Sequence, residues 1–172
     1  MATTDERRAV WLLDVDGVLN AGEPGWGPGT ARSGWARALG GTFRITWAEP
    51  LVARLVALDA SGRAEIRWAT TWVPWIGQIE SLLGLPHWPS AFERAGTHPG
   101  IPAPAQKLAA ALAVLEAEGR RLVWTDDDAI PRTGPELARL TVQPARALLV
   151  RPAPLQGLQP DHLDAIEAFL AG

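Results

Sequence analysis

The sequence is poor in several residue types: it has no cysteine and no tyrosine, one methionine and a single lysine. Without cysteine, the chain can form neither a disulfide nor a metal site built from thiolates. It also lacks long apolar runs. Nothing near its start reads as a signal peptide, and no stretch approaches the ~20 apolar residues of a membrane span. These absences predict a cytoplasmic protein that has no membrane partner.

Positive charge is sparse and scattered as well. The net charge is −3 and the arginines form no basic stripe, so the sequence lacks the electrostatic footprint of a duplex-binding protein. The chain has 172 residues, of which 47% are hydrophobic and 20% are charged, as in an ordinary globular protein. We therefore expect one domain over residues 1–172, large enough to bury a core.

The most informative segment is residues 10–20, VWLLDVDGVLN. An unbroken apolar run, typical of a buried parallel strand, leads directly into Asp14 and Asp16, and Gly17 allows a turn. Ligands of open α/β sheets bind just outside the carboxyl ends of such strands, so both carboxylates are candidate catalytic groups. The alternative is an Asx turn that ends a strand, but such a turn needs only one aspartate.

A second strand-like run, residues 64–72, ends in the hydroxyls of Thr70 and Thr71. Thr70 follows the apolar run directly, so we prefer it as a site residue and keep Thr71 as the alternative. Taken alone this signal is weak, because threonine is simply a good strand former.

The only lysine, Lys107, is the third candidate. A helix is expected to begin near Pro104, with an apolar stripe along it and Gly119 at its end. Lys107 would then lie in the first turn, where the helix dipole disfavours a cation by ~0.3–1 kcal/mol. A residue that opposes a local rule is a site candidate, and the alternative is a solvated surface lysine.

The fourth element, residues 121–128, is an apolar strand that runs into Asp126, Asp127 and Asp128. Three adjacent negative charges repel one another, so a bound cation is a natural compensation. Hard oxygen ligands favour a hard cation such as Mg²⁺. The alternative is an acidic loop that caps the next helix.

These four elements, in this order, resemble the motifs of the haloacid dehalogenase (HAD) superfamily, whose first motif reads hhhhDxDGV-hN with h apolar and whose acidic motif reads hhhhDD. The resemblance extends over nearly the whole chain. It is greatest to HAD-domain proteins of the actinobacterial type and to the HAD domain of multi-enzyme RNA-repair proteins, through LDVDGVLN, WATTW and the acidic pair after a tryptophan. It implies a three-layer Rossmann-like α/β fold with a central parallel sheet, helices on both faces and a small hairpin flap.

The resemblance also implies a function: Mg²⁺-dependent hydrolysis of phosphomonoesters through an aspartyl-phosphate. Asp14 would be the nucleophile and a metal ligand. Asp16 would be the general acid and base and would offer its backbone carbonyl to the metal. Thr70 or Thr71 would bind the phosphoryl group and Lys107 would neutralise charge. Asp126 and Asp127 would hold Mg²⁺, with Asp128 extra or assisting.

Two rival functions come from other classes. One is a catalytically silent HAD-fold protein that acts by binding, since fold does not dictate function; the intact acidic residues and lysine argue against it. The other is a receiver domain like those of response regulators, but there the acidic pair precedes the phosphoacceptor by a whole strand.

The remaining pattern predicts a flap region over about residues 20–48. A loop rich in glycine and proline is expected over 20–34, followed by a hairpin of strands 35–39 and 42–47 around Gly40 and Gly41. About thirty residues leave no room for a cap domain. In the family, an open site suits large substrates or ones that provide their own cover, so the resemblance implies a phosphorylated substrate of unknown size. A nucleic-acid end, which the net charge does not support, a phosphoprotein and a small metabolite all remain candidates. Trp26, Trp35 and Trp47 in this region would either pack or stack on a flat group.

Beyond the flap, helices are expected over 50–58, 74–83 and 160–170, and a strand over 147–150. Residues 85–104 are expected to be irregular, with at most one short strand.

Overall fold

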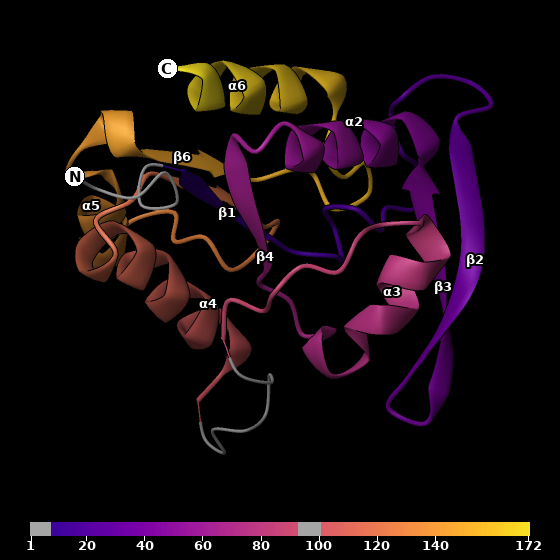
Figure 1. Cartoon of the computed structure of the whole chain (residues 1–172). Helices are drawn as coiled ribbons and strands as arrows, with labels where there is room; N and C mark the ends of the chain where they lie inside the picture. The colour runs from indigo at the N-terminus through magenta and orange to yellow at the C-terminus, as the bar shows by residue number, and fades with distance from the viewer. Residues whose placement is uncertain (1–7, 93–100) are drawn as a thin grey trace.

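Four parallel strands form the central sheet of the protein (Figure 1). The computed structural model describes residues 8–92 and 101–172. The strands pair in the order β4-β1-β5-β6, and every pairing is parallel. Their bounds are β1 (Ala9–Leu13), β4 (Ala64–Trp68), β5 (Leu122–Thr125) and β6 (Ala147–Val150). The predicted α/β class and central parallel sheet are confirmed.

The strands are apolar because helices cover both faces of the sheet. All five residues of β1 are buried, and their side chains alternate between two cores. Trp11 and Leu13 belong to one core, whereas Val10 and Leu12 belong to the other. An unbroken apolar run is therefore what this strand requires.

Helices α2 (Glu49–Ala60) and α6 (Pro160–Ala171) cover one face of the sheet, through Leu55 and Ile166. Helix α4 (Ala103–Leu112), its π-helical continuation η2 (Ala113–Ala117) and α5 (Pro135–Thr141) cover the other (Figure 1). The sequence did not predict α5. This helix is short and buries only Leu140, so it has almost no apolar periodicity to detect.

The flap is an antiparallel hairpin of β2 (Ala31–Ala38) and β3 (Gly41–Ala48). Its two turn residues, Leu39 and Gly40, have φ angles of 51° and 73°, the left-handed region that tight hairpins use. The 3₁₀ turn η1 (Val73–Trp75) and helix α3 (Ile76–Leu83) follow β4, and α3 lies beside β2. A Cβ atom on Gly34 would lie only 2.5 Å from Leu82 Cδ1, so the hairpin and α3 approach closely.

The hairpin is longer than predicted. The expected loop over 20–34 ends at residue 30, and β2 begins at Ala31. Arg32 and Ser33 are both exposed, so the first part of β2 lacks the apolar alternation by which a strand is recognised.

Residues 85–92 are largely irregular, as predicted, and residues 93–100 of that expected stretch lie outside the described part of the chain. Ser90 forms a single parallel bridge to Trp68 at the outer edge of β4. A last 3₁₀ turn, η3 (Pro144–Arg146), leads into β6.

The strand order determines where a site is expected. The chain passes from β1 to β4 on one side and then returns to β5 on the other side of β1. Ligands of open α/β sheets bind at such a reversal, outside the carboxyl ends of the strands. Over residues 8–92 and 101–172, no helix has the length and apolar character that a membrane crossing demands.

Candidate active site

Three neighbouring strands place polar side chains at the carboxyl edge of the sheet. Asp14 follows β1, Asp126 follows β5, and Thr70 lies just beyond β4. The backbone ladder continues into this edge, because Asp14 N donates to Thr125 O at 3.2 Å and Ala69 N donates to Leu13 O at 2.9 Å. Side chains from distant parts of the sequence thus meet at the strand-order reversal.

Lys107 joins the two aspartates. Its Nζ atom donates to Asp14 Oδ2 at 2.6 Å and to Asp126 Oδ2 at 2.7 Å. All three residues are buried, with exposed fractions of 6% for Asp14, 6% for Lys107 and 0% for Asp126. The sequence predicted Lys107 within the first turn of the helix, but α4 begins at Ala103 and Lys107 lies just past that turn. The two carboxylates, rather than the helix, account for a cation at this position.

Backbone N–H groups hold the other oxygens of these carboxylates. Asp14 Oδ1 accepts from Val15 N at 2.7 Å. Asp126 Oδ1 accepts from Asp128 N at 3.0 Å and from Ala129 N at 2.6 Å. Each carboxylate is therefore fixed in orientation, with one oxygen on the backbone and one on Lys107.

The electrostatic balance of this group still favours a further cation. Burial raises the pKa of Asp14 to about 7; Lys107 opposes this shift and Asp126 adds to it. The pKa of Lys107 is raised, since the two carboxylates outweigh the effect of burial. Burial, and then Asp126, raise the pKa of Asp127. One lysine thus compensates only part of the negative charge.

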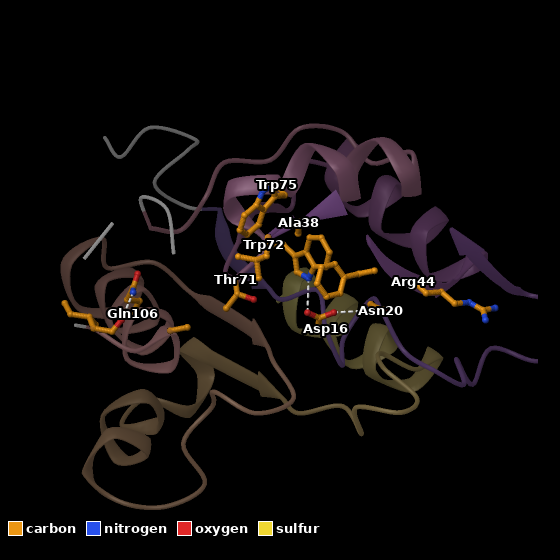
Figure 2. Close-up of a pocket in the computed structure, with 12 residues that line it drawn as sticks. Asp16, Asn20, Ala38, Arg44, Thr71, Trp72, Trp75 and Gln106 are labelled. Carbon is orange, nitrogen blue, oxygen red and sulfur yellow. Dashed lines mark hydrogen bonds between the residues drawn. The ribbon is translucent and has the colours of Figure 1, made fainter. Parts of the chain in front are cut away.

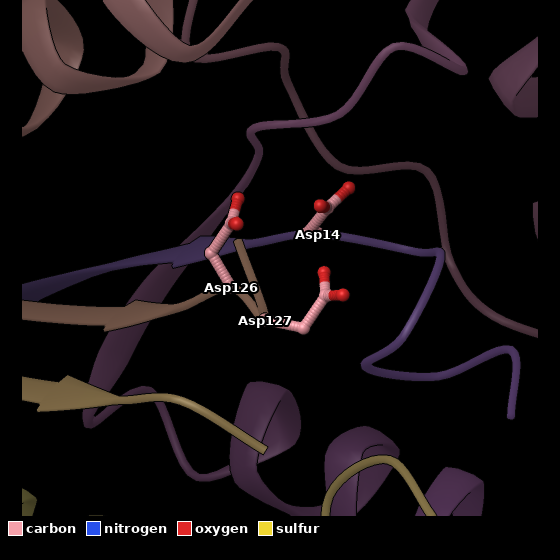
Figure 3. A group of neighbouring side chains, drawn as sticks. All are labelled: Asp14, Asp126 and Asp127. Carbon is pink, nitrogen blue, oxygen red and sulfur yellow. The ribbon is translucent and has the colours of Figure 1, made fainter. Parts of the chain in front are cut away.

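Three carboxylates converge closely enough to hold a metal ion (Figure 3). Asp14, Asp126 and Asp127 each offer one oxygen, and these atoms lie within 4.8 Å of one another. Asp128 is exposed and does not belong to this group, so the structure favours Asp127 where the sequence left both open. The donor set consists of hard oxygens only, which suits a hard cation.

Gly17 is required beside this cluster. Its φ angle is +68°, and a Cβ atom there would lie 2.4 Å from Asp127 Cγ. Any other residue would combine a left-handed backbone with a clash against the third carboxylate.

Asp16 does not join the cluster. Its side chain is exposed, Oδ1 accepts from Asn20 Nδ2 and Oδ2 from Trp72 Nε1, both at 2.8 Å (Figure 2). Asn20 Oδ1 in turn accepts from Thr46 N at 2.9 Å, which ties the turn to the flap. Asn20 ends the first motif and Trp72 ends the WATTW segment, but the sequence analysis assigned neither a role, so it missed both partners.

The two threonines differ in their surroundings. Thr70 is fully buried, and its hydroxyl is one of the groups that lower the pKa of Asp14. Thr71 is exposed and faces a cavity. Thr70 is therefore the hydroxyl beside the predicted nucleophile.

The cavity has a volume of about 490 Å³ and lies between the flap, η1 and the start of α4 (Figure 2). Its polar lining residues are Asp16, Asn20, Arg44, Thr71 and Gln106. Among the flap tryptophans, Trp26 donates to Leu158 O at 2.6 Å and Trp47 packs against the core, whereas Trp35 is exposed.

Comparison of the chain with protein-family models, with curated proteins and with solved structures gave no match.

Proposed function

We propose that this protein is a Mg²⁺-dependent phosphohydrolase of the HAD type, which hydrolyses phosphomonoesters through an aspartyl-phosphate on Asp14. One observation carries the proposal: Lys107 bridges Asp14 and Asp126 at the strand-order reversal, with Asp127 alongside. The four sequence motifs supply these residues in the order that the HAD resemblance requires.

In the first step, an oxygen of Asp14 attacks phosphorus in line with the ester bond. The P–O bond to the leaving group breaks as the bond to Asp14 forms, which divides one difficult hydrolysis into two easier steps. Backbone and lysine contacts already orient the carboxylate, so little ordering remains at the moment of reaction.

A phosphomonoester carries negative charge that would repel the carboxylate. Lys107 is the residue of this chain that would neutralise it, and the hydroxyl of Thr70 would donate to a phosphoryl oxygen. Asp14, Asp126 and Asp127 would hold Mg²⁺, and the bound ion would supply further positive charge for the phosphoryl oxygens.

Asp16 would act on the leaving-group side. It would donate a proton to the departing oxygen and would then accept one from the water that attacks the aspartyl-phosphate. Breakage of the bond between phosphorus and Asp14 releases inorganic phosphate and restores both carboxyl groups. The exposed position of Asp16 at the cavity supports this role, because a leaving group needs space there.

The proposal is tested with ethyl phosphate and p-nitrophenyl phosphate, assayed with Mg²⁺ and with EDTA. Turnover should require Mg²⁺ and should vanish in Asp14→Asn, in which an amide replaces the nucleophile. Asp128→Asn is the matched control: this carboxylate lies outside the three-residue cluster, and its loss should leave turnover intact. Thermal melting in parallel should show Mg²⁺ stabilising the folded protein, by ~2.7 kcal/mol at a hundredfold excess over Kd.

Turnover that survives chelation would exclude the metal role. Absence of turnover in the wild-type protein, together with a normal melting curve, would favour the catalytically silent alternative. Equal losses in Asp14→Asn and Asp128→Asn would remove Asp14 as the nucleophile.

A further inference from the structure

The cavity beside Asp16 has mainly apolar walls. Leu39 and Phe43 line it from the flap, and Ile101 lines it from the segment just before α4. Trp72 and Trp75 line it from the segment after β4 (Figure 2). Seven large hydrophobic side chains are exposed over residues 8–92 and 101–172, and three of them, Leu39, Phe43 and Ile101, line this one cavity. Exposed apolar groups that gather around a hollow indicate a binding site.

Two lining residues are neighbours in sequence of residues in the proposed reaction centre. Asp16 lines the cavity and follows the proposed nucleophile by two residues. Thr71, which also lines the cavity, follows the buried Thr70 directly. A phosphoryl group at Asp14 would therefore direct its leaving group into this space.

Aromatic rings are prominent in the wall. Phe43 and Trp72 pack edge to face, with ring centroids 5.8 Å apart and an interplanar angle of 86°. Trp72 also donates to Asp16 Oδ2, so the ring that lines the cavity holds the proposed acid. Aromatic faces and edges bind flat ring systems by stacking.

Two polar side chains at the margin of the cavity are candidates to contact the polar part of a ligand. Arg44 and Gln106 both line the cavity. Gln106 Nε2 donates to Ile101 O at 2.8 Å, whereas its Oε1, although buried, has no hydrogen-bond partner within residues 8–92 and 101–172. This oxygen is closed off from the cavity, so the exposed Arg44 is the polar group at the margin that a ligand can reach.

We propose, as an extension of the phosphatase function above, that this cavity binds a flat ring in the leaving group, so that the preferred substrates are phosphomonoesters of ring-bearing alcohols such as nucleosides. Its volume of about 490 Å³ is within the range of small-ligand pockets. Stacking on Phe43, Trp72 and Trp75 supplies the selectivity, and Asp16 meets the leaving oxygen at the mouth.

The test uses two matched substrate pairs, each with the same kind of primary alkoxide as leaving group. AMP is compared with ribose phosphate, and benzyl phosphate with ethyl phosphate. The ring-bearing member of a pair should have a kcat/KM higher by about 5- to 150-fold, the range expected for one stacked ring. Preference within the first pair alone assigns the cavity to nucleosides, and preference within both pairs assigns it to flat rings in general.

Two variants test the location. Phe43→Ala and Trp75→Ala should each lower the ratio of kcat/KM within a pair by about fivefold or more. Trp35→Ala is the control, because this ring lies on the same hairpin, is 66% exposed and does not line the cavity. It should keep the wild-type ratio.

The outcomes separate this inference from the function on which it rests. Hydrolysis of both members of each pair at equal kcat/KM overturns the ring preference while the phosphatase proposal stands. The same holds if Trp35→Ala lowers the ratio as much as Phe43→Ala does. Failure of all four esters and of p-nitrophenyl phosphate overturns the phosphatase proposal itself.

Discussion

Replacement of Lys107 by methionine tests the electrostatic design of the site. Methionine keeps most of the length and apolar volume of the side chain but removes the charge. Asp14 and Asp126 are then left buried without the cation that both contact. Loss of one partner from a buried ion pair costs about 3–5 kcal/mol, a large share of the ~5–15 kcal/mol by which domains are stable.

The loss should depend on pH in a defined direction. Burial and Asp126 already raise the pKa of Asp14 to about 7 while Lys107 is present. Without Lys107 this pKa rises further, so the folded state takes up a proton where the unfolded state does not. A folded pKa above the unfolded value makes stability fall as pH rises, up to the folded pKa. The deficit of Lys107→Met should therefore be larger at pH 8 than at pH 5.

Urea denaturation in EDTA at both pH values measures this effect, with an unchanged m value as the check on two-state behaviour. Arg139→Met is the control, because it removes a cation from an exposed ion pair with Glu116 at 2.8 Å. Solvent screens that ion pair, so the urea midpoint of Arg139→Met should hardly differ from that of the wild type. If Lys107→Met shifts the midpoint at pH 8 no more than Arg139→Met does, the two carboxylates do not depend on Lys107, and the reasoning is refuted.

Three further predictions follow from the same site. In metal-free protein, the wild type should lose stability as pH rises from about 4 to about 7, because the folded pKa of Asp14 is raised. Asp14→Asn has no carboxyl group at this position and should lack this loss, as urea midpoints across the range would show. Gly17→Ala should lose more stability and more of its Mg²⁺ thermal shift than Gly62→Ala, which has a similar φ angle of +67° but open space at its Cβ position. Asp16→Asn should slow the first step ~10²–10⁴-fold for alkyl phosphates and much less for p-nitrophenyl phosphate, as single-turnover kinetics would show.

Each of these has a contrary result. A parallel pH dependence of Asp14→Asn and the wild type would mean that Asp14 does not carry the raised pKa. Equal Mg²⁺ shifts for the two glycine variants would mean that Asp127 is not displaced by a Cβ atom at position 17. Equal first-step losses on both ester types would mean that Asp16 does not act as the acid.

The backbone elements were predictable wherever apolar periodicity is strong. The fully buried β1 and the amphipathic α6 are such cases, and both lie close to the predicted residues. Helix α5 and the first residues of β2 are exposed and carry little apolar pattern, so local sequence does not distinguish them from loops.

The site was predictable only as a set of residues. Lys107 and Asp14 are 93 positions apart, and their ion pair depends on how α4 packs against the sheet rather than on local sequence. The same applies to Trp72 and Asp16, which are 56 positions apart. The cavity requires the flap, η1 and α4 together, and no single segment encodes it.

Because the only lysine is buried, its chemical modification can report local opening of the site. Lys107 carries the sole ε-amine of the chain, and that amine is engaged by two carboxylates inside the fold. Amine-reactive reagents should therefore modify it only when α4 separates from the sheet edge, so the labelling rate measures local opening at the site. A ¹³C-methyl group introduced on the same nitrogen under opening conditions would give one lysine signal, with no other to assign against.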